Sequence, residues 1–312
     1  MINLENKSFE KVWGPGSQAP YLSQTLRSEG VLLTQYYAIA HLSAPNYLAQ
    51  ISGQASNPAT RADCPSYTPF TPTGTASPGQ VTGSGCVYPS SVPTLAGQLS
   101  SADKSWKAYM EDMGTPCRHP ELGSRDSSQG AKMGDQYATR HNPFVYFQGI
   151  TSSPLCQSNV VDFSQFAADL ATVQTTPNLS YISPNLCDDG HDSPCVDGRP
   201  GGLATINAWL KQQVPKILDS PAFKEDGMLV ITFDEAEGNT TGPSGIPGGT
   251  GGGRIGALVL SPHTKGGTTS SILYNHYSLL ASIEDIFSLP HLGYAGATGL
   301  NRFGPDVFNL SH

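Results

Sequence analysis

Two acidic residues, Asp234 and Glu235, directly follow the apolar run MLVITF at residues 228–233. The run is rich in β-branched and aromatic residues, so it predicts a buried strand that ends at the acidic pair. Ligands of open α/β sheets bind in the crevice outside the carboxyl ends of the strands. The pair is therefore a candidate metal or catalytic site; a solvated acidic turn is the simpler alternative.

A second strand exit has the same character, because the short run 2–4 is followed by Glu5 and Asn6. If the two strands are parallel neighbours, Glu5, Asn6, Asp234 and Glu235 meet at one edge of the sheet. Oxygen ligands of this kind suit hard divalent cations, and histidines elsewhere could add zinc or iron character. We expect one divalent metal ion, with Ca, Mg, Zn, Mn and Fe all open. Alternatively, Asn6 caps a turn and Glu5 pairs with an arginine.

The segment HLSAPNYLAQISG at 41–53 predicts a helix with Ser43 as its N-cap, Pro45 in its first turn and a stop at Gly53. Capping is the commoner role of such a serine. A helix N-terminus also binds phosphate and favours an ionised hydroxyl. With a metal beside it, Ser43 becomes a candidate nucleophile.

Three histidines complete the candidate set: His141 before NPFVYF, His191 in CDDGHD, and His276 before YSLLASIEDIF. A lone histidine is more often a hydrogen-bonded structural residue than a catalyst. His191 is the strongest candidate because three carboxylates surround it in the sequence, those of Asp188, Asp189 and Asp192. A carboxylate neighbour is expected to raise the pKa of His191, which would suit a general acid for a leaving alkoxide.

The composition excludes some partners. The 312 residues carry a formal net charge of −8, and charged residues make up only 13%. No basic run occurs, which argues against a nucleic-acid or anionic-membrane binder. No apolar stretch reaches about 18 residues, so no spanning helix is expected.

Six cysteines, none in a CxxC pair, indicate an exported protein with disulfides rather than a zinc site. Fifteen pairings are possible; proximity along the chain favours Cys64 with Cys86, Cys187 with Cys195, and Cys117 with Cys156. We expect a secreted or periplasmic protein. Since Met1 leads directly into INLENKSF, with no signal peptide, we also expect further residues before Met1 in the natural gene product.

Strand-like and helix-like segments alternate along the chain. This pattern predicts a three-layer α/β/α sandwich with a largely parallel central sheet, formed by one domain over residues 1–312. Strands are expected at residues 2–4, 30–37, 144–147, 179–182, 228–233 and 255–260. Helices are expected at 203–218, with a kink at Pro215, and at 277–287.

Residues 57–93 differ from the rest, because Pro, Ser, Thr and Gly dominate and no period emerges. We expect a surface excursion that a disulfide holds in place. A lid over the site is one role it could have. Tyr67, Phe70 and Tyr88 could line a lipid route, although scattered loop aromatics more often pack the loop down. The Gly-rich stretch 238–253 is also predicted to be a loop.

Several blocks occur together in one order: ENKSF, HLSAPNYLAQISG, HNPFVYF, PNLCDDGHD, ITFDEAEG and HYSLLASIEDIF. Together they resemble the bacterial phosphoesterase family, which includes acid phosphatases and phospholipases C and is similar in fold to alkaline phosphatase. The blocks span nearly the whole chain. The resemblance implies a metal-dependent phosphoric ester hydrolase that works through a phosphoseryl intermediate. Its implied substrate is a small phosphoester or a phospholipid head group.

The resemblance also implies roles for individual residues. Glu5, Asn6, Asp234 and Glu235 would bind the metal. Ser43 would be the nucleophile, and Asn46 would help to hold the phosphate. His191 and His141 would contact phosphate oxygens or protonate the leaving group, with Asp192 beside the substrate.

Two departures from the family pattern bear on these roles. The first strand begins only at Met1, which puts the support of Glu5 in question, and Ala236 with Glu237 replaces the small or His residue often found after the acidic pair. The number of metals is therefore open. Monoester and diester substrates are also both open.

Two other functions are considered. A serine acyl esterase could use Ser43 and His191, but no GxSxG elbow occurs in the chain. A non-catalytic extracellular binding protein is the second alternative, and the complete set of metal-site side chains argues against it.

Overall fold

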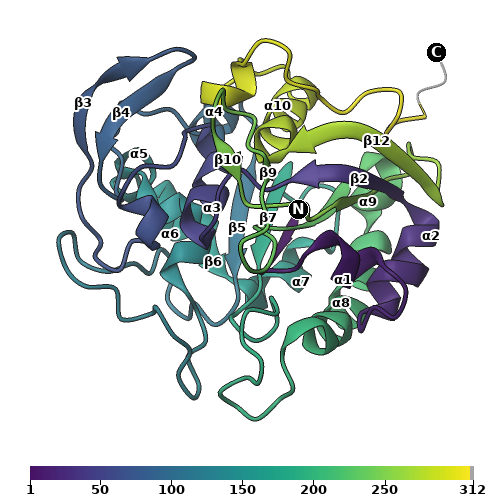
Figure 1. The fold of residues 1–312 in the computed structure, drawn as a ribbon. Coiled ribbons are helices and arrows are strands. Elements are labelled where there is room, and N and C mark those ends of the chain that lie inside the picture. Colours follow the sequence, from purple (N-terminus) through teal and green to yellow (C-terminus); the bar gives the residue numbers. More distant parts are fainter. Residues whose placement is uncertain (310–312) are drawn as a thin grey trace.

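A computed structural model describes residues 1–309, in which eight strands form one central sheet (Figure 1). The strand order is β12 (Thr268–Asn275), β2 (Val31–Tyr37), β11 (Ala257–Leu260), β8 (Leu229–Phe233), β1 (Ile2–Leu4), β7 (Leu179–Ser183), β5 (Trp106–Met110) and β6 (Val160–Asp162). Strand β11 runs antiparallel to both neighbours, and all other neighbouring pairs are parallel. The predicted largely parallel sheet is confirmed.

The central strands β1 and β8 are buried along their whole lengths. Strands buried on both faces read as continuous apolar runs, which is why the sequence revealed them. They pair in parallel, with Ile2 opposite Ile231 and Leu4 opposite Phe233. This register brings the residues that follow each strand side by side, and the Asp234 backbone N–H donates to Leu4 O at 2.9 Å.

Helices cover both faces of the sheet (Figure 1). On one side α3 (Ser43–Ser52) packs against α10 (His276–Ile286), and on the other α8 (Gly202–Leu218) packs against the short π-helix Tyr21–Leu26. Helix α8 continues through Pro215 and buries an apolar stripe toward the core. Among residues 1–309, no helix is both long enough and apolar enough to span a bilayer.

The remaining elements are short. The helices are α1 (Phe9–Trp13), α2 (Arg27–Glu29), α4 (Leu95–Ser101), α5 (Gln148–Thr151), α6 (Leu155–Asn159), α7 (Phe166–Asp169) and α9 (Pro221–Asp226). The small strands are β3 (Thr71–Ala76), β4 (Gln80–Ser84), β9 (Gly242–Pro243) and β10 (Thr250–Gly251). The last two are the only regular structure in the Gly-rich stretch that was predicted to be a loop.

One predicted strand is wrong. Residues 143–146 form a short 3-10 helix, Pro143–Tyr146, where a strand at 144–147 was expected. Pro143 opens this turn, a position that suits its fixed φ and missing N–H. A short buried apolar run does not by itself distinguish strand from helix, so the misreading has a physical reason. Strands β5, β6 and β12 were not predicted, because polar and charged residues interrupt their apolar patterns.

The excursion at 57–93 carries the exposed hairpin β3–β4 and has no core of its own. Tyr67, Phe70 and Tyr88 are buried in the main core, so they pack the loop down. All three predicted disulfides are present: Cys64–Cys86, Cys117–Cys156 and Cys187–Cys195.

Candidate active site

Ser43 lies at the start of α3, close to the exit of β1. It is the first helical residue rather than the predicted N-cap, because Leu42 occupies the cap with φ 69° and ψ 150°. A non-glycine residue in such a region costs about 1–3 kcal/mol, and strain of this kind clusters at functional sites. The Ser43 side chain is buried, and its Oγ donates to Glu5 Oε2 at 2.9 Å.

Asn46 holds the strained turn that leads into Ser43. Its Oδ1 accepts from the backbone N–H groups of Ile39 and Ala40, and its Nδ2 donates to Ala40 O and Leu42 O at 2.9 Å each. Both amide hydrogens are thereby used. Asn46 therefore supports the turn in this structure, and its predicted contact with phosphate stays a prediction.

The two strand exits converge as expected from the sequence. Asp234 Oδ1 accepts from the Asn6 backbone N–H at 2.9 Å, and Glu5 is fully buried. Three buried oxygens here have no hydrogen-bond partner among the described residues: Glu5 Oε1, Asn6 Oδ1 and Asp234 Oδ2. Unpaired buried acceptors are costly, and a hard cation would satisfy them. The donor set fits a divalent metal.

The electrostatics agree with that fit. Burial, then the charges of Asp234 and Asp189, raises the pKa of Glu5 well above its usual range. Burial raises the pKa of Asp234 to about 6. Burial and the neighbouring Asp234 raise the pKa of Glu235 to about 9. Carboxylates crowded in this way repel one another, and a bound cation would offset the repulsion.

Glu235 points toward a histidine that the sequence reading did not select. Its Oε2 contacts His41 Nδ1, and His41 Nε2 lies 2.7 Å from Thr240 O. The predicted metal ligand Glu235 is thus engaged with His41 in this structure. The position of His41, two residues before Ser43, was the available signal.

His141 is buried and stacks on Tyr47, with ring centroids 5.1 Å apart. Burial lowers the pKa of His141 well below its usual range, so the ring is neutral. Its Nδ1 lies 3.1 Å from Asp189 Oδ2 and its Nε2 lies 3.4 Å from Glu5 Oε1. If Nδ1 donates to Asp189, the Nε2 lone pair faces a carboxylate oxygen, an arrangement that calls for a cation. Ligand atoms of Glu5, His141 and Asp189 all lie within 4.8 Å of one another.

His191 lies on the neighbouring loop, but its expected pKa shift is wrong. Its Nδ1 lies 2.8 Å from Asp192 Oδ1, as the sequence suggested. Burial and the positive charge of Arg140 nevertheless lower the pKa of His191, and these effects outweigh the pull of Asp192. The Arg140 guanidinium donates to Nε2 at 3.2 Å. The error arose because the sequence revealed neither the burial of the ring nor Arg140 beside it.

Lys7, Asp63 and Arg140 are charged residues of the site that sequence reasoning missed. Lys7 Nζ donates to Glu5 O, Asn6 O and Gly190 O at 3.2, 3.0 and 2.9 Å. Two of the three adjoin motif residues, since Lys7 follows the EN pair and Arg140 precedes His141; Asp63 instead precedes the disulfide residue Cys64. Adjacency to a motif was the available signal for Lys7 and Arg140.

A buried polar network around His276 supports the turn that carries Asp234. His276 Nε2 lies 2.7 Å from Asp234 O. The His276 Nδ1 atom lies 3.1 Å from Gln50 Nε2 and 3.2 Å from Tyr36 OH. Because Gln50 is on α3, this network links the helix that carries Ser43 to the turn that carries Asp234. His276 therefore has a structural role here.

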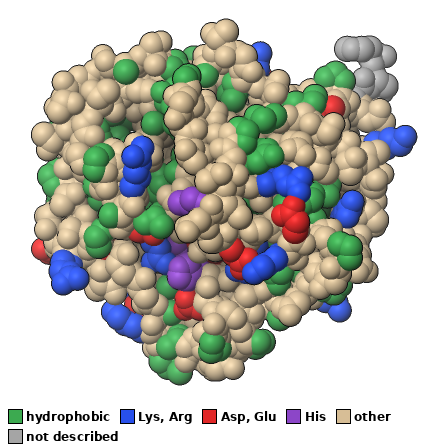
Figure 2. Space-filling view, viewed as in Figure 1, with side chains coloured by type: hydrophobic (Ala, Val, Ile, Leu, Met, Phe, Trp, Pro, Cys, Tyr) green, Lys and Arg blue, Asp and Glu red, His purple; other side chains and the backbone are tan. Residues whose placement is uncertain are grey.

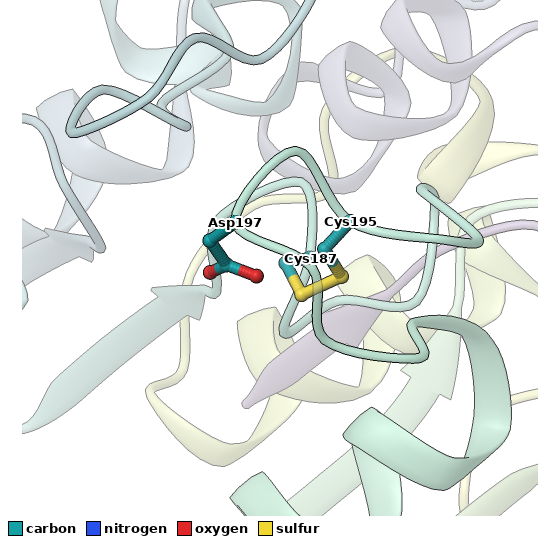
Figure 3. Close-up of side chains that lie close together, drawn as sticks. All are labelled: Cys187, Cys195 and Asp197. Atoms are coloured by element: carbon teal, nitrogen blue, oxygen red, sulfur yellow. A yellow bond between two sulfur atoms is a disulfide. The ribbon is translucent and has the colours of Figure 1, made fainter.

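A second cluster of metal-type residues does not form a metal site. Cys187, Cys195 and Asp197 lie close together, but Figure 3 shows that the two sulfurs are joined in a disulfide. Disulfide sulfur lacks the thiolate that binds metals.

Figure 2 shows histidine side chains near the middle of one face, with acidic and basic side chains around them.

The sequence profile of the Phosphoesterase family matches residues 15–290. A phosphate-repressible acid phosphatase of Penicillium chrysogenum is 29% identical over 292 residues, which are 94% of this chain and 59% of that protein. A phosphatidylinositol-3-phosphatase of Mycobacterium tuberculosis is 28% identical, over 93% of this chain and 77% of that protein.

Among solved structures, a protein of the alkaline phosphatase superfamily from Vibrio parahaemolyticus matches with a TM-score of 0.51 and 13% identity. The match covers 92% of this chain and 65% of that one, and it shows a shared fold. The chain spans about three fifths of the length of the fungal acid phosphatases that it matches.

Proposed function

This chain belongs to the phosphoesterase family, and we propose that it is a metal-dependent phosphoric ester hydrolase in which Ser43 receives the phosphoryl group. We treat residues 1–312 as one catalytic domain. The acid phosphatases and the phosphatidylinositol-3-phosphatase among its relatives support the reaction class. They favour it over an acyl esterase or a non-catalytic binding protein.

One observation carries the proposal. The Ser43 hydroxyl donates to Glu5, and beside it three buried oxygens lack partners: Glu5 Oε1, Asn6 Oδ1 and Asp234 Oδ2. The Glu5 carboxylate thus contacts the nucleophile through one oxygen and offers its other, unpaired oxygen to a cation. This combination is what phosphoryl transfer to a serine requires.

In the proposed site Glu5, Asn6, Asp234 and Glu235 hold one divalent ion. When bound, the metal supplies Lewis-acid stabilisation of the phosphate charge and lowers the pKa of the attacking hydroxyl. The chain itself orients that hydroxyl, through the hydrogen bond to Glu5 and through the turn that Asn46 fixes. His141 and His191 remain the residues predicted to contact phosphate oxygens or to protonate the leaving group, with Asp192 holding the His191 ring.

The proposal also covers the compartment. All six cysteines are paired in three disulfides, which persist in oxidising environments. We therefore propose a secreted or periplasmic protein. Non-reducing mass spectrometry of protein isolated from the natural source should find no free thiol.

Replacing the nucleophile is the decisive test. Ser43→Ala should abolish turnover of an aryl phosphate while the melting temperature and the metal content stay near those of the parent protein. Ser52→Ala, at the other end of α3, is the matched control and should retain activity. Rapid acid quench of the parent enzyme should give a phosphorylated peptide that contains Ser43. Full activity in Ser43→Ala would overturn the assignment.

A further inference from the structure

Arg140 is a buried cation that Asp63 links to the start of α3. It lies in the short turn Thr139–His141, and only 4% of its surface is exposed. One guanidinium nitrogen donates to Gln129 O at 2.9 Å, and the other terminal nitrogen lies 3.2 Å from His191 Nε2. The side chain is thus held in one place by neutral groups.

Within residues 1–309, no carboxylate is hydrogen-bonded to Arg140. Its one ion pair is with Asp63, whose Oδ2 lies 4.0 Å from Arg140 Nε, beyond hydrogen-bonding distance. A buried charge costs several kcal/mol unless an opposite charge and hydrogen bonds compensate it. A guanidinium carries five N–H donors, and the contacts above use two of them. Arg140 therefore has unused donors and positive charge to offer an anion.

Asp63 ties this cation to the residues around Ser43. Its Oδ1 accepts from the backbone N–H of Ala44, the residue after Ser43, at 2.9 Å. On its other flank Arg140 touches His191, whose ring centroid is 6.0 Å from that of His141. Arg140 thus adjoins both the start of α3 and the histidine pair. An anion on Ser43 would lie within reach of these groups.

We propose that Arg140 binds a non-bridging oxygen of the substrate's terminal phosphate and thereby makes the site selective for phosphomonoesters. This inference rests on the proposed hydrolase function and names its substrate class. A monoester offers three non-bridging oxygens and up to two negative charges; a diester offers two oxygens and one charge. The guanidinium fork matches the extra oxygen and charge, and the second ester group of a diester would take that place.

The test compares two substrates with the same leaving group. The parent enzyme should prefer p-nitrophenyl phosphate to bis(p-nitrophenyl) phosphate in kcat/KM. Arg140→Gln should lower the monoester value by about 100-fold, as for loss of one donor to a transition-state oxygen, and the diester value by less than about threefold. Arg140→Lys keeps the positive charge but not the planar guanidinium. Its kcat/KM for the monoester should lie between those of the parent enzyme and Arg140→Gln. Arg118→Gln, at a surface arginine paired with Asp135, is the matched control.

A phosphate-binding measurement tests the role of Arg140 even if the enzyme turns over neither substrate. Inorganic phosphate should bind Ser43→Ala at least about tenfold more tightly than Ser43→Ala/Arg140→Gln in calorimetry. If Arg140→Gln does not fold, as judged by its melting curve, Arg140→Lys serves in both comparisons.

The outcomes separate the two proposals. Equal losses on both substrates, or a parent enzyme that prefers diesters, would overturn the role of Arg140 and leave the hydrolase function standing. A parent enzyme that hydrolyses neither ester with metals supplied would contradict the hydrolase function. Phosphate binding would then decide the Arg140 site alone, and equal affinity in the single and double variants would overturn it.

Discussion

On one side of the candidate site the functional groups directly follow buried strands, whereas on the other side they lie on loops. We call Glu5, Asn6 and Asp234, at the exits of β1 and β8, the strand side. We call Asp63, Arg140 and His191 the loop side. The strand side is positioned by parallel pairing between Leu4 and Phe233 in the centre of the sheet. Its geometry therefore depends on the core.

The loop side is positioned by covalent links and irregular backbone. Asp63 adjoins the Cys64–Cys86 disulfide and has a φ of +57°, in the left-handed region. His191 belongs to the small loop, residues 187–195, that the Cys187–Cys195 disulfide closes. Because the two sides are held in place differently, different substitutions should disrupt each of them. Loss of strand-side ligands should remove the metal, and loss of crosslinks should disturb the anion-binding groups.

The largest effect is expected on the strand side. Asp234→Ala removes a proposed metal ligand and should lower metal affinity by more than about 100-fold, since loss of an outer partner already costs about 10- to 100-fold. Metal analysis after dialysis measures this. Asp219→Ala, at an exposed carboxylate paired with Lys224, should keep its metal. Full metal occupancy in Asp234→Ala would contradict the proposed ligand set.

The next effect separates the two sides directly. Removing the Cys64–Cys86 crosslink in Cys64→Ser/Cys86→Ser should lower the free energy of unfolding by about 3 kcal/mol. It should also weaken phosphate binding, because Asp63 loses its support, while metal affinity stays unchanged. Cys117→Ser/Cys156→Ser is the control, with a comparable stability loss but unchanged phosphate binding. Loss of metal in the first variant would show that the two sides are not separately supported.

A smaller, pH-dependent effect concerns Glu111, which holds the segment that leads into the His191 loop. Its Oε2 accepts from the Asn185 backbone N–H at 3.0 Å and its Oε1 accepts from Trp209 Nε1 at 3.1 Å. Burial raises the pKa of Glu111 to about 7. The folded state therefore binds this proton more tightly than the unfolded state, so this group's contribution to stability falls as pH rises from about 4.5 to 7.

Glu111→Gln removes that titration. The unfolding free energy of the variant, minus that of the parent, should rise by on the order of 2 kcal/mol between pH 4.5 and 7 and level off above it. Urea unfolding at several pH values measures the difference, with the exposed Glu121→Gln as control. A pH-independent difference would show that Glu111 does not titrate in this way.

The sequence could predict the strand side because local rules govern it. Buried parallel strands are continuous apolar runs, so the polar residues after them, Glu5, Asn6 and Asp234, stood out. The disulfides also followed from proximity along the chain. In each case one physical signal determined the answer.

The loop side could not be predicted in the same way. Asp63 reaches Ala44 only because the excursion folds back over α3, and Arg140 meets His191 across 51 residues of chain. No local pattern encodes such contacts. The pKa of His191 was misjudged because neither its burial nor its contact with Arg140 follows from local sequence. Ser43 was misplaced by one position because a strained Leu42 precedes it.

Lys7 joins the two sides. Its ammonium donates three hydrogen bonds to carbonyl oxygens, two at the exit of β1 and one at Gly190 inside the small disulfide loop. Moving the loop away from the sheet would leave one hydrogen of this buried ammonium without its carbonyl partner. The exit of β1 and the loop are therefore bound to open and close as one cooperative unit, so backbone amides of both segments should share a single rate of solvent exchange.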